Sequence, residues 1–310
     1  MSYLTQESIQ KRVKVTMLVG LPASGKSSYI KNKHGVIISS DEYRKKLYND
    51  VNNQTNNTEL FKKMFDDCVV ALKNNSDVFY DACNINYKRR RQFVSEIKRL
   101  VPNAICECLL VVTPYENCLY NNSNRPRSVP ENIILKMYLN FTVPTYQEGW
   151  DKIGCIMSQD YIKNYKPLDF NYFMTFNQDN SHHLLTLGEH LIEAHNHCCK
   201  LTSDKIIRRA ALLHDIGKPF TKSFTNFNGE ITTEAHYRNH QNVGAYDSLM
   251  HSYHYFGNTG DILRVSALIQ WHMQPYFIET EKAKKKFLNI VGEKMYNDIM
   301  LIHECDRAAH

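Results

Sequence analysis

The sequence predicts two structural parts, an α/β domain built on a parallel sheet followed by an all-α domain. Two observations indicate this division. In the first half, short apolar runs alternate with amphipathic stretches, whereas beyond about residue 180 the apolar residues recur at helical spacing. The length of 310 residues is enough for two domains, each with its own core.

The α/β pattern begins with four apolar runs typical of buried strands, at residues 13–19, 36–39, 78–80 and 105–112. Helical stretches at residues 59–72 and 90–100 lie between them, and the segment GWDKIGCIM holds a last strand. Because strands and helices alternate, we expect a parallel sheet covered by helices.

A change in composition marks the end of this pattern. Beyond Met157 the chain is rich in Tyr, Asn, Lys and Asp up to about Asn180, which predicts a linker. The helical pattern that follows is clear in Leu184, Leu187 and Leu191. The expected domains are residues 1–165 and 166–310.

Composition and cysteine usage favour a soluble protein of the cytoplasm. The chain is 43% hydrophobic and 23% charged, and no apolar run approaches the ~18 residues of a membrane span. The apolar run near the start is too short for a signal peptide. The nine cysteines are scattered, which predicts neither disulfides nor a zinc site but reduced thiols.

The net charge of +6 is concentrated in the first half. Residues 1–150 hold 21 Lys and Arg against 14 Asp and Glu, and the remainder holds 17 against 18. A basic half favours an anionic partner such as nucleic acid, although a solvated positive surface explains the charge equally well.

A phosphate-binding loop follows the first strand, where GLPASGKS matches the pattern G-x-x-x-x-G-K-[ST] between a strand and a helix. Its glycines let backbone N–H groups face a phosphate. Lys26 is expected to reach the β and γ phosphates of ATP or another nucleoside triphosphate, and Ser27 to hold Mg²⁺. The expected nucleotide contacts are Gly20, Ala23, Ser24, Gly25, Lys26, Ser27 and Ser28.

A carboxylate and an arginine follow the second strand. Asp41 lies just past the strand end, and Arg44 comes three residues later. In a kinase, such a carboxylate can accept the proton of an attacking hydroxyl while the arginine holds a phosphate. Alternatively, Asp41 caps a helix that begins at Glu42.

Four segments together resemble the 5′-hydroxyl polynucleotide kinase domain of phage and bacterial RNA-repair enzymes: GLPASGKSS, SSDEYRKKL, DVFYDACN and NSNRPRSVP. The resemblance covers about half of the chain. It implies that Asp41 is the general base and that Arg44 contacts the acceptor, although Ser40 stands where the phage enzyme has Arg.

The same resemblance extends to three further residues. Asp81, at the end of the third strand, matches a carboxylate that contacts substrate, although Asp81 could equally be a Walker-B-like residue or a turn aspartate. Arg125 and Arg127 match the lid. One of them, which we take to be Arg125, would stabilise charge on the transferring phosphoryl group, and Arg127 would then contact the nucleotide. A mobile basic loop is the alternative for this RPR segment.

The second half contains four residues suited to a divalent transition metal, namely His190, His214, Asp215 and Asp306. Their order, and the phrase LLHDIGKP with GEH upstream and HxxxH downstream, resemble the HD phosphohydrolase superfamily over roughly residues 180–310. That resemblance implies a helical domain with Mn, Co, Ni, Cu, Zn or Fe at these positions. A bound cation lowers the pKa of water and polarises a phosphoryl oxygen.

Further histidines extend this pattern. In HD enzymes with extra histidines, such residues bind a second metal or the substrate phosphate, so His240 and His272 are candidate ligands and His236 a candidate phosphate contact. Lys218 could neutralise a phosphate oxygen, or merely hold a helix end. Each lone histidine can also be an ordinary polar residue, as we expect for His183, His195, His197 and His303.

Two phosphate-handling domains in one chain are consistent with healing both ends of a broken strand. The resemblances imply addition of phosphate to a 5′-hydroxyl end and removal of a 2′,3′-cyclic, 2′- or 3′-phosphate from the other. The DxDxT phosphatase signature of the phage kinase is absent from this sequence. Expected partners are ends of RNA, tRNA or DNA and a separate RNA ligase, with no membrane.

Two other functions fit the same motifs. The first half could be a small-metabolite or nucleoside kinase and the second an HD nucleotide phosphohydrolase. The chain could also be an ATP-gated regulatory module that binds a nucleotide without turnover. Arg44 and the RPR segment favour the polynucleotide acceptor.

Overall fold

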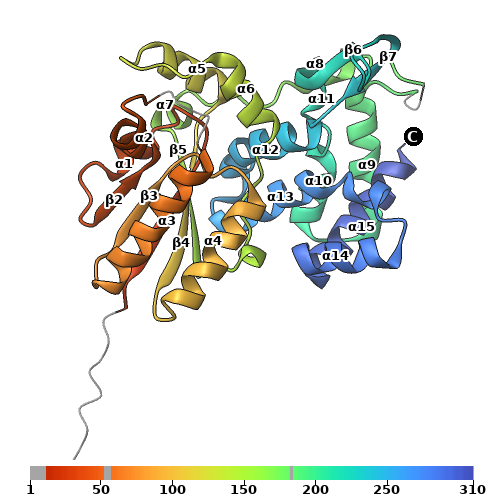
Figure 1. The fold of residues 1–310 in the computed structure, drawn as a ribbon. Coiled ribbons are helices and arrows are strands. Elements are labelled where there is room, and N and C mark those ends of the chain that lie inside the picture. The colour runs from red at the N-terminus through yellow and green to blue at the C-terminus, as the bar shows by residue number, and fades with distance from the viewer. Residues whose placement is uncertain (1–11, 52–56, 182–183, 310) are drawn as a thin grey trace, which may run out of the picture.

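A computed structural model describes residues 12–51, 57–181 and 184–309, so His183 lies outside the described residues. The chain forms a sheet-containing part, red to yellow-green in Figure 1, beside a helical part in green to blue. The fold class predicted from the sequence is therefore confirmed. Within the described ranges, no helix is long and apolar enough to cross a lipid bilayer.

The first part is a sheet of five strands in the order β2-β3-β1-β4-β5, and every neighbouring pair is parallel. The strands are β1 (Lys14–Val19), β2 (Val36–Ser39), β3 (Val78–Asp81), β4 (Ile105–Val112) and β5 (Lys152–Met157). All five were predicted, because apolar runs this short and this regularly spaced are typical of buried parallel strands. The carboxyl ends of β1, β2 and β3 meet at one edge, where ligands bind in such folds.

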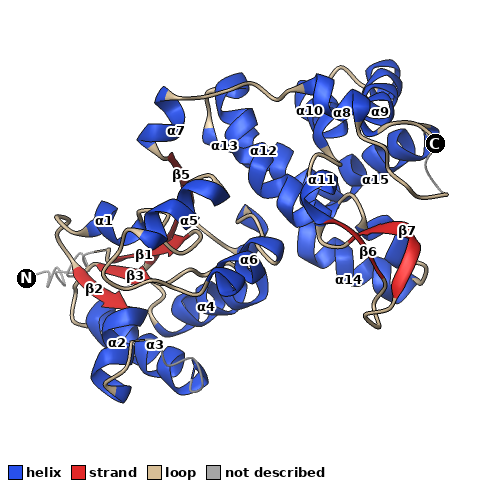
Figure 2. Ribbon diagram, turned by 90° about the horizontal axis from the view of Figure 1, so that it is seen from above, coloured by secondary structure: helices blue, strands red, loops and turns tan. Residues whose placement is uncertain are grey.

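Helices cover this sheet on both sides, as Figure 2 shows in blue against the red strands. They are α1 (Lys26–Ile30), α2 (Ser40–Tyr48), α3 (Asn57–Lys73), α4 (Tyr87–Leu100), α5 (Tyr115–Ser123), α6 (Glu131–Leu139) and the 3-10 turn η1 (Tyr146–Glu148). Helix α4 is held by a buried ion pair, in which Arg90 donates to both oxygens of Glu148 at 2.6 and 2.8 Å. This pair joins α4 to the η1 turn, which precedes β5.

The segment predicted to be a linker contains two short helices, α7 (Gln159–Lys163) and α8 (Phe170–Thr175). Helix α8 packs closely on the helix that contains Gly188. A Cβ on Gly188 would lie only 2.6 Å from the backbone N of Met174, so no larger residue fits there. Gln178, near the end of this segment, is completely buried. The prediction of a linker was therefore wrong for much of this segment, because its polar composition does not reveal that it packs against the rest of the protein.

The second part is mainly helical, with α9 (Leu187–Leu201), α10 (Lys205–Leu213), α11 (Lys218–Thr221), α12 (His240–Phe256), α13 (Thr259–Trp271), η2 (Gln274–Phe277), α14 (Glu281–Val291) and α15 (Glu293–Ala308). Helix α9 begins with a capping box in which Thr186 and Glu189 exchange hydrogen bonds. One antiparallel hairpin, β6 (Lys222–Thr225) and β7 (Ile231–Tyr237), interrupts the helices, although an all-α domain was expected.

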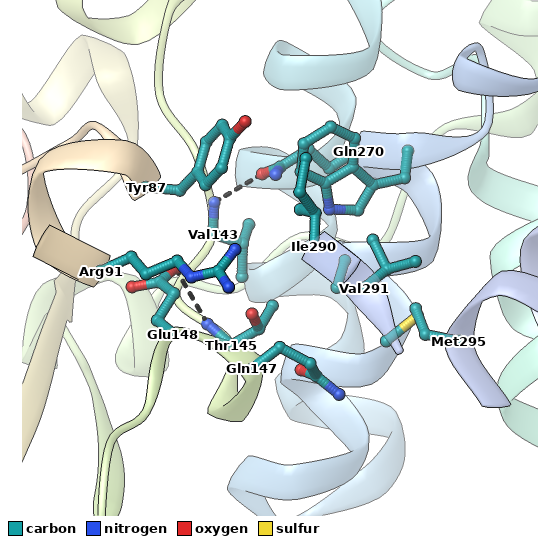
Figure 3. Close-up of a pocket in the computed structure, with 12 residues that line it drawn as sticks. Tyr87, Arg91, Val143, Thr145, Gln147, Glu148, Gln270, Ile290, Val291 and Met295 are labelled. Atoms are coloured by element: carbon teal, nitrogen blue, oxygen red, sulfur yellow. Dashed lines mark hydrogen bonds between the residues drawn. The ribbon is translucent and has the colours of Figure 1, made fainter. Parts of the chain in front are cut away.

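The two parts share one continuous set of buried apolar side chains, although two separate cores were expected. Helix α12 lies between them in Figure 1, and its Tyr246 hydroxyl donates to the Thr113 carbonyl at 2.7 Å. Gln270 accepts a hydrogen bond from the Val143 N–H at 2.6 Å beside a small cavity at this boundary (Figure 3). The boundary is thus packed like a protein interior.

Candidate active sites

The phosphate-binding loop begins where β1 ends, and its backbone is tightly constrained. A Cβ on Gly20 would lie 2.5 Å from the Val111 carbonyl oxygen, and Gly25 has a φ of 97°, which a residue with a side chain adopts only with strain. Ala23, with a φ of 60°, shares the left-handed conformation. The glycines are therefore required by the geometry of the loop.

Lys26 folds back over this loop. Its Nζ donates to the Leu21 carbonyl at 2.6 Å and to the Gly20 carbonyl at 3.0 Å. Ser24 is buried, and its carbonyl oxygen accepts from the Thr113 hydroxyl at 2.9 Å, whereas the Ser28 side chain is exposed. The ammonium group is thus held where a phosphate would enter the loop.

Ser27 and Asp81 come from different elements and meet directly. The Ser27 hydroxyl donates to Asp81 Oδ2 at 2.6 Å. Burial raises the pKa of Asp81, against the opposing effects of the Ser27 hydrogen bond and the Lys26 charge. A hydroxyl and a carboxylate oxygen side by side are the type of ligand that Mg²⁺ prefers.

Asp41 lies between two arginines. Arg127 Nη1 is 2.5 Å from Asp41 Oδ2, and Arg44 Nη1 is 3.5 Å from Asp41 Oδ1. Arg44 is buried and also donates to Asn57 at 2.9 Å, and burial lowers the pKa of its guanidinium despite the Asp41 charge. Two cations around a half-exposed carboxylate indicate a site for an anion with a hydroxyl group.

The helix-cap alternative for Asp41 does not hold. Helix α2 begins at Ser40 with Ser39 in the capping position, so Asp41 is already within the first helical turn and not in front of it. Its carboxylate instead faces Arg127 of the RPR segment.

A single cavity of about 840 Å³ contains these groups. The expected site residues that line it are Ala23, Lys26, Ser27, Asp41, Arg44, Asp81, Arg125 and Arg127. Gly20, Ser24 and Gly25 belong to the loop and Ser28 to α1, and none of these four lines the cavity. The loop that would hold a nucleotide and the strand-end carboxylate therefore face the same space.

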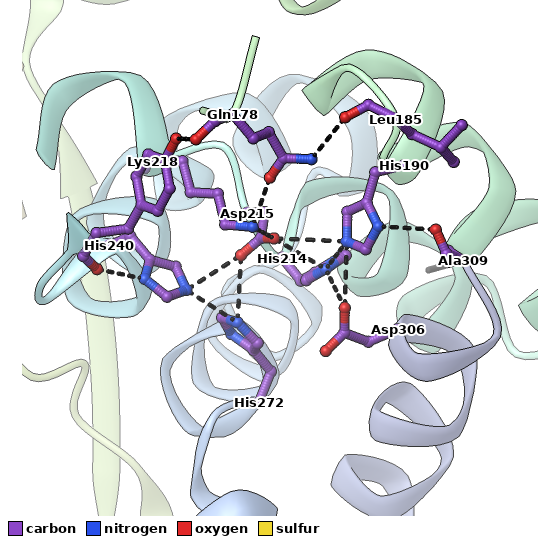
Figure 4. A network of polar contacts seen from close by, with 12 residues as sticks. Gln178, Leu185, His190, His214, Asp215, Lys218, His240, His272, Asp306 and Ala309 are labelled. Atoms are coloured by element: carbon purple, nitrogen blue, oxygen red, sulfur yellow. Dashed lines mark hydrogen bonds and ion pairs between the residues drawn. The ribbon is translucent and has the colours of Figure 1, made fainter. Parts of the chain in front are cut away.

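The second cluster is in the helical part, where Figure 4 shows six side chains pointing toward one another. The side chains form two groups, and within each group the ligand atoms lie within 4.8 Å of one another: one group is His190, His214, Asp215 and Asp306, and the other is Asp215, His240 and His272. The side chains come from α9, the end of α10, α12, the end of α13 and α15. The structure thus brings together all six predicted metal ligands.

Distances within the first group are short. His190 Nε2 is 3.1 Å from His214 Nε2, and Asp306 Oδ1 is 3.1 and 3.2 Å from these two nitrogens. In the second group, His240 Nε2 is 3.2 Å from His272 Nε2 and 3.1 Å from Asp215 Oδ1. Asp215 is common to both groups, with Oδ2 facing the first and Oδ1 the second.

The contacts of Nδ1 determine which nitrogen of each imidazole carries a proton. Each Nδ1 lies against a backbone carbonyl: His190 at 3.3 Å from Ala309, His214 at 2.8 Å from Ala211, His240 at 2.6 Å from Tyr237 and His272 at 2.6 Å from Ile269. Because a carbonyl only accepts, each Nδ1 carries a proton, which leaves Nε2 as the nitrogen that can bind a metal. This is the tautomer that binds a metal.

The donor set therefore fits divalent cations. Two pairs of Nε2 atoms face each other at about 3 Å, and their lone pairs repel unless a proton or a metal cation lies between them. Asp215 Oδ1 is buried and finds no hydrogen-bond donor among the described residues. Imidazole nitrogens with carboxylate oxygens are ligands of Zn, Fe, Mn, Co, Ni or Cu.

Charged neighbours within the cluster strongly shift the pKa values of its residues. Burial by itself would lower the pKa of His214, but the neighbouring Asp215 and Asp306 carboxylates raise it to about 10. Burial would raise the pKa of Asp306, yet hydrogen bonds from His190 and His214 hold it well below its usual value. Both pKa shifts have the same cause, since the carboxylates and the positively charged imidazoles stabilise each other's charged forms.

Three residues support the cluster from outside. Lys218 Nζ is 2.7 Å from Asp215 Oδ2 and donates to Gln178 at 2.7 Å. Its ammonium group therefore contacts a predicted metal ligand and is not directed only at solvent. The Tyr276 hydroxyl donates to Asp306 Oδ2 at 3.1 Å. Neither Gln178 nor Tyr276 was predicted from the sequence, since Gln178 lies in the expected linker and Tyr276 in an aromatic turn.

The remaining histidines do not join the cluster. His236, expected to contact a substrate phosphate, belongs to neither ligand group, and its Nε2 is buried with no hydrogen-bond partner among the described residues. Within the described part of the chain, His195, His197 and His303 are also outside both groups, as expected.

Comparison with known families matches both parts of the chain. The family described as AAA domain matches residues 15–144, and the family described as HD domain matches residues 183–308. No curated protein matches.

Similar solved structures include two described as "Structure of the Pnkp1/Rnl/Hen1 RNA repair complex" and "Structure of Pnkp1/Rnl/Hen1 complex". The first is 19% identical with a TM-score of 0.35, over 42% of this chain and 44% of that chain. The second is 20% identical with a TM-score of 0.31, over 37% of this chain and 40% of that chain. The chain spans less than half the length of either, and neither likeness is close enough to transfer an activity.

The family matches agree with the observed architecture, in which a phosphate-binding loop opens the sheet domain and the His-Asp cluster lies in the helical domain. Residues 15–144 therefore match a P-loop AAA domain and residues 183–308 an HD domain, in this order along the chain.

Proposed function

We propose that this protein heals the two ends of a broken nucleic acid strand. The AAA domain would transfer the γ-phosphate of ATP to a 5′-hydroxyl end, and the HD domain would remove a 2′,3′-cyclic, 2′- or 3′-phosphate from the other end. A separate RNA ligase would then join the healed ends. The observation that carries the proposal is the cavity that contains both the phosphate-binding loop and Asp41 with its two arginines.

In the kinase step, Asp41 accepts the proton of the attacking 5′-hydroxyl. The hydroxyl oxygen bonds to the γ-phosphorus, the bond from that phosphorus to the β-phosphate oxygen breaks, and ADP leaves. Lys26 and Arg125 balance charge on the transferring group, and Arg44 holds the acceptor. Support for these roles comes from the shared cavity and from the pairing of Arg44 with Asp41.

Asp81 and the lid have related roles in this proposal. Asp81 and Ser27 would hold the Mg²⁺ that accompanies ATP, which their 2.6 Å contact supports. Arg127 would contact the nucleotide, and its ion pair with Asp41 keeps it beside the proposed base.

In the HD domain, His190, His214, Asp215 and Asp306 would hold one divalent metal, and Asp215, His240 and His272 a second. When bound, such metals lower the pKa of water and polarise a phosphoryl oxygen. In each hydrolysis the oxygen of water bonds to phosphorus, the bond from phosphorus to the 2′ or 3′ oxygen breaks, and a proton from the water passes to the departing oxygen. A 2′,3′-cyclic phosphate is opened in this way to a 2′- or 3′-phosphate, and a second hydrolysis releases that phosphate and leaves both hydroxyls. Lys218 would orient Asp215 through their 2.7 Å contact and lie ready to pair with the substrate phosphate.

The kinase half is tested with γ-labelled ATP, Mg²⁺ and a 5′-hydroxyl RNA 12-mer, with a matching DNA and a free nucleoside as other acceptors. The wild-type protein should label the oligonucleotide. Lys26→Ala and Asp41→Asn should abolish transfer, whereas Lys166→Ala, an exposed lysine outside the cavity, should not change it. Transfer only to the nucleoside would indicate a small-molecule kinase, and ATP binding with no transfer a regulatory module.

The HD half is tested by release of phosphate from an RNA with a 2′,3′-cyclic phosphate end, with Mn²⁺, Ni²⁺ or Zn²⁺ supplied in turn. His214→Ala should remove this activity together with bound metal. If His214→Ala kept full activity, or if free nucleotides were hydrolysed and the RNA end were not, the proposed substrate would be wrong.

A further inference from the structure

A basic groove lies between α4 of the AAA domain and α14 of the HD domain. It has a volume of about 720 Å³ and receives side chains from both helices. Figures 1 and 2 show these helices as neighbours across the boundary between the domains. The cations that line the groove are Lys88 and Arg91 of α4 and Lys282, Lys285 and Lys286 of α14.

The charge of this groove is not compensated. All five cations are exposed, and no carboxylate belongs to the groove lining. Among the described residues, none of the five forms an ion pair, whereas Lys98 and Arg99 on the same helix α4 do. Five unpaired cations from two domains repel one another unless an anion lies between them.

The groove adjoins the cavity of the kinase site. Gln92 lines both spaces, and Arg89, from the same exposed side of α4, lines the cavity. Arg91 also borders the small interdomain cavity in Figure 3, opposite Ile290 of α14. A strand whose end occupies the kinase cavity can therefore continue along α4 into the groove.

The chemistry of the lining selects the kind of partner. Apart from Tyr87 and Ile290, the lining consists of cations and neutral polar residues such as Gln92 and Asn289, which are common phosphate contacts. A protein partner would require a larger apolar centre. The repeated negative charges of a sugar-phosphate backbone match such a row of cations.

We propose that the groove between α4 and α14 binds the phosphodiester backbone of the acceptor strand, beyond the terminal nucleotide that enters the kinase cavity. This inference rests on the proposed polynucleotide kinase function and extends it. It also gives the HD domain a part in acceptor binding, because α14 supplies three of the five cations.

The test compares the full-length protein with the variant Lys282→Ala/Lys285→Ala/Lys286→Ala. Its matched control is Lys163→Ala/Lys166→Ala/Lys200→Ala, which removes three exposed lysines outside the groove. Binding of a fluorescent 5′-hydroxyl RNA 12-mer is measured by anisotropy at several salt concentrations. The ratio of kcat/KM for the 12-mer to that for a nucleoside 3′-monophosphate, which is too short to reach the groove, is measured in parallel.

The groove variant should bind the 12-mer about tenfold more weakly and lose about 2 units of the slope of log affinity against log salt, since each phosphate contact contributes about 0.7 for a single strand. Its kcat/KM ratio should fall about tenfold. A charge-conserving variant, Lys282→Arg/Lys285→Arg/Lys286→Arg, should restore both values, and the control variant should match the wild-type protein.

Equal RNA affinity and salt dependence in the groove variant and its control would overturn this inference. Loss of affinity that the arginine variant does not restore would also overturn it, because structural damage would then be the cause. Failure of the wild-type protein to phosphorylate any acceptor would instead refute the kinase proposal, and the binding measurement would still decide the role of the groove.

Discussion

At the scale of single residues, Asp215 has the most demanding position in the molecule. One oxygen faces His190 and His214 at 3.5 and 3.4 Å, and the other faces His240 and His272 at 3.1 and 3.4 Å. A carboxylate shared by two ligand groups can bridge two cations, whereas an amide of the same size carries no charge.

Asp215→Asn is therefore expected to reduce the affinity for both metals by more than about 100-fold. Metal content per chain, measured by inductively coupled plasma mass spectrometry after dialysis, should fall at both sites. His195→Ala, on the same α9 as His190 but outside both ligand groups, is the control and should keep its metal. Full occupancy in Asp215→Asn would remove Asp215 from both sites.

A second residue makes stability depend on pH. Asp247 on α12 accepts a hydrogen bond from Tyr138 of α6 at 2.6 Å, at the boundary between the domains. Burial raises the pKa of Asp247 to about 7, with an opposing effect of the Tyr138 hydrogen bond and a further increase from the Glu116 charge. The folded protein therefore holds this proton over a pH range in which the unfolded chain has released it.

Because the folded-state pKa is the higher one, the contribution of Asp247 to stability is fully present below about pH 4 and is lost as pH rises toward 7. The slope is at most about 1.4 kcal/mol per pH unit. Urea denaturation of the wild-type protein and Asp247→Asn is measured between pH 5 and 8. The unfolding free energy of the wild-type protein should fall with rising pH relative to that of the variant. Parallel pH dependence in the two proteins would contradict the assignment.

At the scale of helices, the HD cluster depends on how closely α12 approaches the turn after α10. Gly217 lies directly against α12: a Cβ there would collide with the His240 carbonyl and lie 2.6 Å from the Gly244 backbone N. The close approach places His240 beside Asp215, so a glycine in this turn is a requirement of the site.

Gly217→Ala should displace α12, destabilise the protein by about 1 to 3 kcal/mol or more, and weaken the second metal site most. Thermal unfolding and metal titration measure the two effects. Gly260→Ala is the matched control, because its added Cβ would meet only the Asn258 side chain at an ordinary 3.5 Å. Equal effects of the two substitutions would show that helix packing is not the cause.

At the scale of the whole molecule, α12 links the two candidate sites. His240 is its first residue, and Tyr246, less than two turns later, bonds to Thr113, whose hydroxyl donates to Ser24 of the phosphate-binding loop. Six residues of helix span about 9 Å. A displacement of the loop can thus reach a metal ligand through rigid elements.

Tyr246→Phe should cost about 1 to 3 kcal/mol, because the buried Thr113 carbonyl loses its hydroxyl donor and keeps only the Cys118 thiol at 3.5 Å. ATP with Mg²⁺ should raise the melting temperature of the wild-type protein by a different amount when metal is bound at the HD site than when it is not. This difference should be smaller in the variant. Additive effects of nucleotide and metal in both proteins would show that the sites are independent. Tyr161→Phe is the control, since the Tyr161 hydroxyl has no hydrogen-bond partner in the described structure.

Much of this architecture follows from local sequence. The strands and the phosphate-binding loop were predictable because short apolar runs, and glycines between a strand and a helix, have strong local preferences. The hairpin of β6 and β7 was not, since a short strand pair that buries little has no apolar alternation to indicate it. The helices at residues 159–163 and 170–175 were missed because their stability comes from packing on distant residues and not from a pattern of their own.

By itself, the sequence determined which residues can carry phosphate and metal chemistry, because that depends on side-chain type and on motifs such as GLPASGKS and LLHDIGKP. Only the tertiary structure decided how they combine. Asp215 serves both ligand groups, Gln178 reaches Lys218 from the expected linker, and α4 and α14 form one basic groove. These relations join residues that are far apart in the chain, and they arise when helices pack, a step on which the order of residues along the chain gives no direct information.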